Sequence, residues 1–286
     1  MNSVPLMRPK WPVPKNIRAY CTLRHPGNSW GMYSSFNLAL HVQDNPQDVL
    51  ANRKALMHYA QLPSEPRWLN QTHSTIPVIA ERSSIETPAD ASYTQQKGIV
   101  CVVMTADCLP ILVTNQEGTE VAAIHAGWRG LADGVIEQTI SALHSHADSL
   151  MIWIGPSISQ PYYEVGEDFY AAFKQQHTQE ELDAAFEYKH SRSNVGANNI
   201  RPNSIDAKKG ECYSPLQNSV VLDNNTKWLA NVPLLAQQRL IKLGVKAQNI
   251  YLSNECTYAR RERYFSYRRD NVTGRMASFI WIVGSE

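Results

Sequence analysis

The chain has 286 residues, 43% of them hydrophobic and 19% charged, which is the composition of an ordinary globular protein. Its 27 basic and 26 acidic residues nearly cancel, which argues against a nucleic-acid-binding protein that relies on bulk charge. The absence of a membrane-span-length apolar run and of a signal-peptide core, together with an odd count of five cysteines, predicts a cytoplasmic protein with reduced thiols and no membrane contact.

The N-terminal third predicts one strand and one helix. Residues 17–24 alternate as a strand does and end in a Pro-Gly turn. A helix is expected to begin at Pro46, with Asn45 as its N-cap, and to end near Tyr59. The residues expected to face the core from this helix are Val49, Leu50, Leu56 and Met57.

The middle of the chain predicts strands with one helix among them. Residues 98–105 form a continuous apolar run rich in β-branched side chains, which is typical of a strand buried on both faces. Further strands are expected at 109–113, 121–125 and 150–156, with a helix over 131–146. The unusual residues of this region therefore lie at the ends of strands.

The last third begins with a polar, Asn- and Ser-rich stretch, 191–226, which we interpret as a long surface excursion. A helix over 233–243 and strands over 250–253 and 275–283 follow. We therefore predict one α+β domain that spans residues 1–286.

Three side chains that can bind a metal lie at predicted strand ends or turns: His73, Cys108 and His125. Three protein ligands with a fourth position left for water are typical of a catalytic zinc site. The separations of 35 and 17 residues are too long to be diagnostic, so histidines bonded in the core and an inert buried thiol stay open as alternatives. A second alternative is a nucleophile and base pair formed by Cys108 and His125, which a chelator would spare and an alkylating agent would inactivate.

Two other classes of function are disfavoured. A multicopper oxidase needs many more histidines than the nine in the chain can supply. Arginines and aromatic residues interleave over 258–269, as on a platform for single-stranded nucleic acid, but the near-neutral charge argues against that use. We expect no nucleic-acid partner.

Five long motifs resemble the YfiH-type laccase-domain family, which is also named for polyphenol oxidase and for peptidoglycan editing. Together with earlier matches they cover nearly the whole chain from about Arg24 onward. They are NQTHS (70–74), TADCLPIL (105–112), AAIHAGWRG (122–130), IGPSI (154–158) and YFSYRRDNVTGRMAS (264–278).

The resemblance implies a fold, a metal and an activity. The implied fold is a mixed β-sandwich flanked by helices, with internal pseudo-duplication. The implied metal is zinc (Zn2+), held by His73, Cys108 and His125. The implied activity is phosphorolysis of adenosine, inosine and methylthioadenosine, joined by adenosine deamination, so that the partners are a nucleoside and phosphate. The alternative within the family is an amidase that edits wrongly incorporated serine in peptidoglycan precursors.

The residues that handle phosphate or ribose are less clearly marked. We expect Arg24 and Arg129 to contact phosphate or ribose, because guanidinium groups bind oxyanions in a bidentate manner, with Asn37 as a polar partner. The family's usual Cys-Tyr-Glu-Val-Gly is Tyr-Tyr-Glu-Val-Gly here (162–166), so that cysteine is absent, and an arginine near the first strand is shifted. These departures bear on substrate preference and leave the three metal ligands intact.

Overall fold

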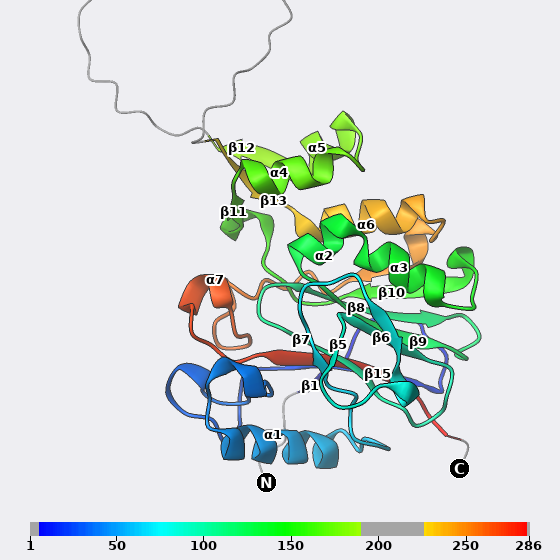
Figure 1. The fold of residues 1–286 in the computed structure, drawn as a ribbon, viewed down its shortest axis with the longest axis vertical. Helices are drawn as coiled ribbons and strands as arrows, with labels where there is room; N and C mark the ends of the chain where they lie inside the picture. The colour runs from blue at the N-terminus through cyan, green and yellow to red at the C-terminus, as the bar shows by residue number, and fades with distance from the viewer. Residues whose placement is uncertain (1–5, 190–225, 285–286) are drawn as a thin grey trace, which may run out of the picture.

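The computed structural model describes residues 6–189 and 226–284. Within them the chain forms a mixed α/β fold with four sheets and seven α-helices (Figure 1). None of the described helices has the length and apolarity needed to cross a membrane. The surface excursion predicted at 191–226 lies, apart from its last residue, outside the described residues.

Two large sheets form the centre of the molecule. One is antiparallel and has the strand order β1 (Leu6–Met7), β2 (Ile17–Thr22), β15 (Met276–Ile282), β7 (Cys101–Thr105). The other is mixed and has the order β14 (Ile250–Leu252), β10 (Leu150–Ile154), β8 (Leu109–Asn115), β9 (Val121–Ala126), β6 (Ala91–Thr94), β4 (Pro77–Ile79).

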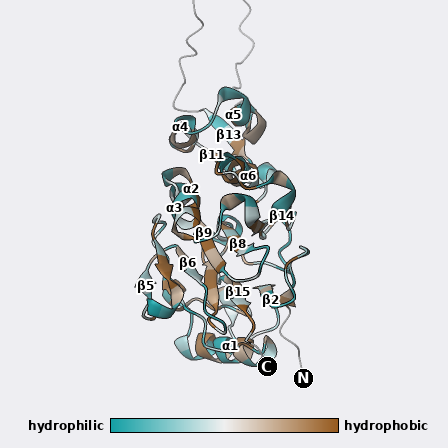
Figure 2. Cartoon of the chain, turned by 90° about the vertical axis from the view of Figure 1, so that its right-hand side faces the viewer, coloured by the Kyte–Doolittle hydropathy of each residue, from teal (hydrophilic) through white to brown (hydrophobic). Residues whose placement is uncertain are grey.

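The two sheets pack face to face, and helices cover their outer sides. Cys101 and Val103 of β7 belong to the same buried cluster as Leu112 of β8, between the sheets. Val102 of β7 points the other way, toward Leu56 of helix α1 (Pro46–Tyr59). Because each central strand has a packed layer on both sides, its sequence is apolar without alternation, as the run at 98–105 predicts. Figure 2 shows this apolar colouring along the strands between the helical layers.

The outer face of the mixed sheet is covered by helices α2 (Trp128–Asp133), α3 (Val135–Ala142) and α6 (Val232–Lys242). Smaller elements lie beyond α6 at one end of the molecule (Figure 1). They are α4 (Glu167–Lys174), α5 (Gln179–Ala185) and a sheet of β11 (Glu164–Val165), β13 (Lys227–Ala230) and β12 (Phe186–Lys189). The remaining elements are the two-stranded sheet of β3 (Leu69–Asn70) and β5 (Thr87–Pro88), and helix α7 (Tyr267–Asp270).

Both predicted ends of the first helix are confirmed, but one of the four residues that were expected to face the core does not. The Asn45 side chain accepts a hydrogen bond from the Gln47 N–H, so it caps α1 as expected. Val49 and Leu56 are buried, but Leu50 is 54% exposed. Leu50 follows Val49 by one residue, which turns its side chain about 100° away from the buried face.

The helix expected over 131–146 is wrong in its extent. Gly134, at φ +104°, separates α2 from α3, and α3 ends at Ala142. Beyond it, the backbone N–H groups of His144 and Ser145 donate to the buried carboxylate of Glu120 instead of continuing a helix. The predicted first strand is also shorter than expected and ends at Thr22. The internal pseudo-duplication stays a prediction.

Candidate metal centre

Three separate segments bring the predicted ligands together. His73 lies in the loop after β3, Cys108 in the turn between β7 and β8, and His125 near the end of β9. The candidate ligand atoms of these three side chains all lie within 4.8 Å of one another. The distance from Cys108 Sγ to His73 Nε2 is 4.0 Å. In the described part of the chain this is the one group of three or more such side chains that could hold a metal ion.

Asp90 positions both histidines through hydrogen bonds, one to the ring of His125 and others to the backbone of the His73 loop. His125 Nδ1 donates to the Asp90 carboxylate at 2.7 Å, which leaves Nε2 of His125 for the centre. The same carboxylate accepts the backbone N–H groups of Thr72, His73 and Ser74 at 3.2, 3.1 and 2.6 Å. Burial raises the pKa of Asp90, but these hydrogen bonds, that of His125 first, outweigh burial and lower it. The sequence analysis missed this residue, because a lone aspartate before a strand forms no pattern.

In the metal-free centre Cys108 is drawn toward the thiolate and His125 toward the imidazolium, so a metal ion would bind there in exchange for a proton of His125. Burial raises the pKa of Cys108, but hydrogen bonds with His125 and His73 outweigh burial and bring it down to about 6. The thiol is therefore mostly a thiolate at neutral pH, which is the form that binds metals. In the metal-free chain, burial lowers the pKa of His125, whereas its bonds to Asp90 and Cys108 raise it to about 9.

A glycine makes room for the His73 ring. A Cβ built on Gly127 would lie 2.3 Å from His73 Cδ2. The backbone of Gly127 has an ordinary φ of −63°, so the position needs glycine for space and not for conformation. The His73 and His125 rings then meet edge to face, with their centroids 4.9 Å apart. The donor set and this close packing fit a divalent ion of the zinc type held by three protein ligands.

The turn that presents Cys108 is anchored by the residue before it. Asp107 has φ +93°, a backbone conformation that residues other than glycine rarely adopt. Its carboxylate accepts hydrogen bonds from the hydroxyls of Thr257 and Ser266 at 2.6 and 3.0 Å, and from the Arg268 N–H at 2.7 Å. Asp107 therefore joins the Cys108 turn to the C-terminal segment.

Two cavities open onto the centre, and both are lined by His73 and Cys108. The first, of about 400 Å³, is walled by the polar side chains of His41, Gln71 and Arg275, and we call it the arginine cavity. Arg275 Nη1 donates to the carbonyls of residues 273 and 274, which fixes the guanidinium in this wall.

The second cavity, of about 270 Å³, has an aromatic wall formed by Trp128 and Tyr163, and we call it the aromatic cavity. Arg268 also lines it, with its guanidinium 4.9 Å from the centre of the Tyr163 ring. The Arg268 guanidinium also donates to the Glu164 carbonyl at 2.8 Å. The centre thus faces a cationic polar space on one side and an aromatic space on the other.

The structure does not bring the three predicted phosphate or ribose residues into the walls of these two cavities. Arg24 lines a separate cavity with Asp270 and donates from Nε to the Ser34 carbonyl at 2.7 Å. Arg129 is exposed and lies over the Trp128 ring at 4.2 Å.

Asn37 is fully buried and contacts the backbone of Arg275, a residue that lines the arginine cavity. Its Nδ2 donates to Asp44 Oδ2 at 2.9 Å, and its Oδ1 accepts the Arg275 N–H at 2.9 Å. The roles of Arg24, Asn37 and Arg129 stay predictions. The cations that line the two cavities, Arg268 and Arg275, lie in the 264–278 motif, which was the signal for them in the sequence.

Comparison with known proteins gives one consistent result. The family model described as multi-copper polyphenol oxidoreductase laccase matches residues 18–201 and 202–283. The chain is 39% identical over 279 residues to purine nucleoside phosphorylase YfiH of Escherichia coli (strain K12), covering 97% of this chain and 99% of that protein. It is 41% identical over 275 residues to the purine nucleoside phosphorylase of Haemophilus influenzae, covering 96% of this chain and 98% of that protein.

Solved structures agree with the sequence relatives. A Neisseria meningitidis protein described under DUF152 is similar at a TM-score of 0.80 and 38% identity, covering 98% of this chain and 99% of that one. YlmD from Geobacillus stearothermophilus is similar in fold, at a TM-score of 0.76 and 23% identity, covering 94% of this chain and 93% of that one.

Proposed function

We propose that this chain, which belongs to the family described as multi-copper polyphenol oxidoreductase laccase, is a zinc-dependent purine nucleoside phosphorylase. The observation that carries the proposal is identity of about 40% over nearly the full length to relatives named purine nucleoside phosphorylase. The substrates would be phosphate with adenosine, inosine or methylthioadenosine. His73, Cys108 and His125 would hold the zinc ion. When bound, zinc supplies a Lewis acid that polarises oxygen ligands and makes a bound water more acidic.

Phosphate fits the arginine cavity. Guanidinium groups bind phosphate oxygens through paired N–H donors, and Arg275 is held with its backbone on Asn37 and part of its guanidinium on backbone carbonyls. Burial and the positive charges of Arg275 and Arg53 lower the pKa of His41, so its neutral ring offers a further hydrogen-bond donor. The dianion would thus meet one fixed cation and neutral polar groups.

The purine fits the aromatic cavity. A flat base gains stacking contacts from Trp128 and Tyr163, and Arg268 over the Tyr163 ring can donate to ring nitrogens as the base leaves. Because both cavities are lined by His73 and Cys108, this arrangement would bring the C1′ carbon of the nucleoside next to phosphate. A phosphate oxygen would bond to C1′ while the C1′–N9 bond breaks, and the departing base would take up a proton.

We extend the proposal to adenosine deamination, in which water replaces the amino group and ammonia leaves. Two features support this extension: three candidate ligands lie at one centre, and two cavities adjoin it. The amidase on serine-bearing peptidoglycan precursors and the Cys108 thiol hydrolase are the competing functions. The thiol hydrolase is supported by the lowered pKa of Cys108, which makes the thiolate available as a nucleophile.

The test is release of the base from inosine in the presence and absence of phosphate, measured by chromatography on zinc-loaded protein. We expect hypoxanthine and ribose 1-phosphate only with phosphate, and a loss of at least ~100-fold in Cys108→Ala, because the variant lacks one of three metal ligands. Cys256→Ala, which removes the other half-buried thiol among the described residues, is expected to retain the activity.

Two outcomes would contradict the proposal. If zinc-loaded protein releases no base from inosine or adenosine, the purine function falls and cleavage of serine-bearing peptidoglycan precursors is tested next. If the activity resists a strong chelator and is lost on alkylation of Cys108, the thiol mechanism replaces the metal mechanism.

A further inference from the structure

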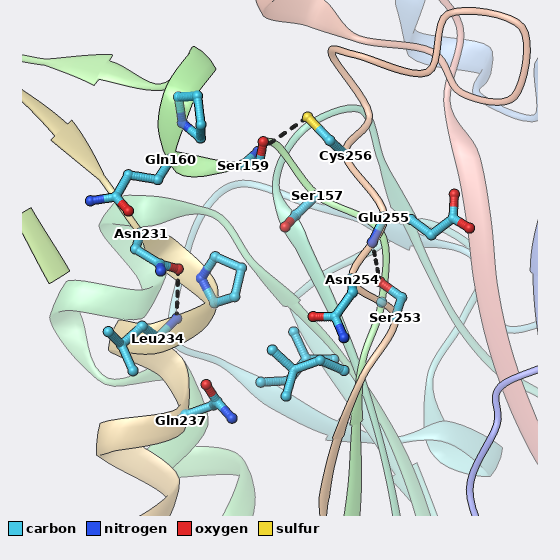
Figure 3. A pocket seen from close by; sticks show the side chains of 15 residues that line it. Ser157, Ser159, Gln160, Asn231, Leu234, Gln237, Ser253, Asn254, Glu255 and Cys256 are labelled. Carbon is cyan, nitrogen blue, oxygen red and sulfur yellow. Dashed lines mark hydrogen bonds between the residues drawn. The ribbon is translucent and has the colours of Figure 1, made fainter. Parts of the chain in front are cut away.

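A third cavity, of about 430 Å³, has none of His73, Cys108 and His125 in its lining. Figure 3 shows the side chains that do line it. It is formed where the parallel strands β10 and β14 end, at Ile154 and Leu252, and where helix α6 begins. The carboxyl ends of parallel strands are the edge of a sheet at which ligands commonly bind. No proposed step of phosphorolysis uses this cavity.

Ser157 supplies a hydroxyl that points into the cavity (Figure 3). The residue is only 4% exposed. Its backbone is fixed on both sides, because its N–H donates to the Glu255 carbonyl at 3.3 Å and its carbonyl accepts the Thr257 N–H at 3.0 Å. Among the described residues the hydroxyl itself has no hydrogen-bond partner. The oxygen is not shut off from solvent, so it is free to bond with a ligand hydroxyl in the cavity.

Carboxamide groups complete a polar wall around Ser157. Gln237 and Asn254 line the cavity, and within the part of the chain that the structure describes their side chains make no hydrogen bond. Asn231 uses its oxygen to cap α6, accepting the Leu234 N–H at 3.1 Å, which leaves its NH₂ group for a ligand. Together these groups offer both donors and acceptors, as hydroxyl groups of a ligand require.

The wall carries no charge that faces the cavity. Glu255 is its one acidic residue, and the carboxylate pairs with Arg260 and Arg263 at 3.3 and 3.6 Å, directed away from the cavity (Figure 3). The first turn of α6 offers no anion site either, because Asn231 caps it and its second residue is Pro233. The lining also contains no aromatic ring on which a base could stack.

We propose that this cavity is a second ligand site that binds the hydroxyl groups of a neutral pentose, as a free sugar or as the ribose of a nucleoside. The hydroxyls would bond to Ser157, Gln237 and Asn254, and the carbon side of the sugar would lie on Leu234 and Leu252. A phosphorylated sugar is excluded by the absence of a facing cation.

The site shares a wall with the aromatic cavity. Ser157 is followed by Ile158, and Asn231 by Val232, and both apolar neighbours line the aromatic cavity. The Ile158 N–H also donates to the Asp107 carbonyl at 3.0 Å, next to Cys108. A ligand in the second site would therefore lie against the same chain segments that line the candidate active centre.

The test measures binding of ribose to the full zinc-loaded chain by saturation-transfer NMR, with no turnover required. We expect ribose signals from the wild type, retained in Cys108→Ala, and reduced about threefold or more in Ser157→Ala and in Gln237→Ala, since each loses hydrogen bonds to the ligand. Gln175→Ala, an exposed glutamine outside this cavity, is the control and is expected to bind as the wild type does.

A second arm uses inosine without phosphate in calorimetric titration, which separates the two sources of the sugar. Two binding events in the wild type and one in Ser157→Ala would assign the site to a nucleoside, whereas ribose binding with a single inosine event would assign it to the free sugar. Absence of both ribose binding and a second inosine event would overturn the proposal. So would ribose signals that are equal in Ser157→Ala, Gln237→Ala and the wild type, provided that all three melt alike. Neither result depends on whether phosphorolysis is observed.

Discussion

At the scale of single residues, Asp90 has the largest influence on the candidate metal centre without lining it. One buried carboxylate orients the ring of His125 and also accepts three backbone N–H groups of the loop that carries His73. Carboxylates behind metal-bound histidines fix the ring tautomer and raise the basicity of the ligand. Two of the three ligands therefore depend on one side chain that no ligand pattern in the sequence reveals.

We expect Asp90→Asn to weaken zinc binding by about 10- to 100-fold, because the neutral amide loses the charged acceptor for His125 and for the backbone donors. Competition with a coloured chelator measures the affinity. Asp133→Asn, at an exposed position of α2, is the matched control and should bind zinc as the wild type does. Equal affinity in Asp90→Asn and wild type would show that Asp90 does not position the ligands.

Gly127→Ala tests the space that the His73 ring needs. The added methyl would lie 2.3 Å from His73 Cδ2, so the ring must move while the backbone angles stay acceptable. We expect loss of zinc affinity and activity with a folded chain, measured by metal analysis and circular dichroism. Gly284→Ala meets no atom within 4 Å and serves as the control. Normal zinc content in Gly127→Ala would mean that His73 is not a ligand.

The residues of the site differed in how far they could be predicted. The sequence analysis found the three candidate metal ligands because their residue types are rare and chemically distinctive, and the motif resemblance brought them together. It placed phosphate near Arg24 and Arg129, whereas the cations that line the two cavities are Arg275 and Arg268. An arginine carries the same charge wherever it lies, so only the fold distinguishes one that lines a cavity at the candidate metal centre from one that pairs with Asp270 in a separate cavity.

At the scale of elements, the turn between β7 and β8 connects the two large sheets and presents Cys108 where they meet. The strands on both sides of it were predictable, because each is an apolar run buried on two faces. The break of the next helix at Gly134 was not, because a glycine inside an otherwise helical pattern is often tolerated. The long apolar strands thus followed from the sequence pattern, whereas the short strands β4 and β6 of the mixed sheet and the junctions between elements, which depend on tertiary contacts, did not.

Asp107→Ala is expected to lower the free energy of unfolding by about 3 kcal/mol, because three donors, from Thr257, Ser266 and Arg268, lose a charged acceptor inside the protein. The positive φ of residue 107 persists as strain. Urea unfolding of metal-free protein measures the change, with the exposed Asp133→Ala as the control. A difference below ~1 kcal/mol between the two variants would show that this turn is held by other contacts.

At the scale of the whole molecule, the packing of the two large sheets against each other explains why the centre needs the complete fold. Cys108 lies in the turn that leads from β7 of the antiparallel sheet to β8 of the mixed sheet, and His125 lies on β9 of the mixed sheet. His73 lies in a loop that Asp90, next to β6, holds in place. A long-range assembly of this kind leaves no short spacing in the sequence, which is why the separations of the ligands were uninformative. The same long range couples metal binding to global unfolding.

Zinc is therefore expected to stabilise the whole chain against heat. An ion that binds only the folded state adds RT ln(1 + [L]/Kd), or about 2.7 kcal/mol when free zinc is 100 times Kd, which raises the melting temperature by several degrees. Calorimetry with and without zinc measures the shift. Cys108→Ala should lose most of it, and Cys256→Ala should keep it, because its thiol lies outside the centre. Equal shifts in both variants would place the zinc elsewhere in the protein.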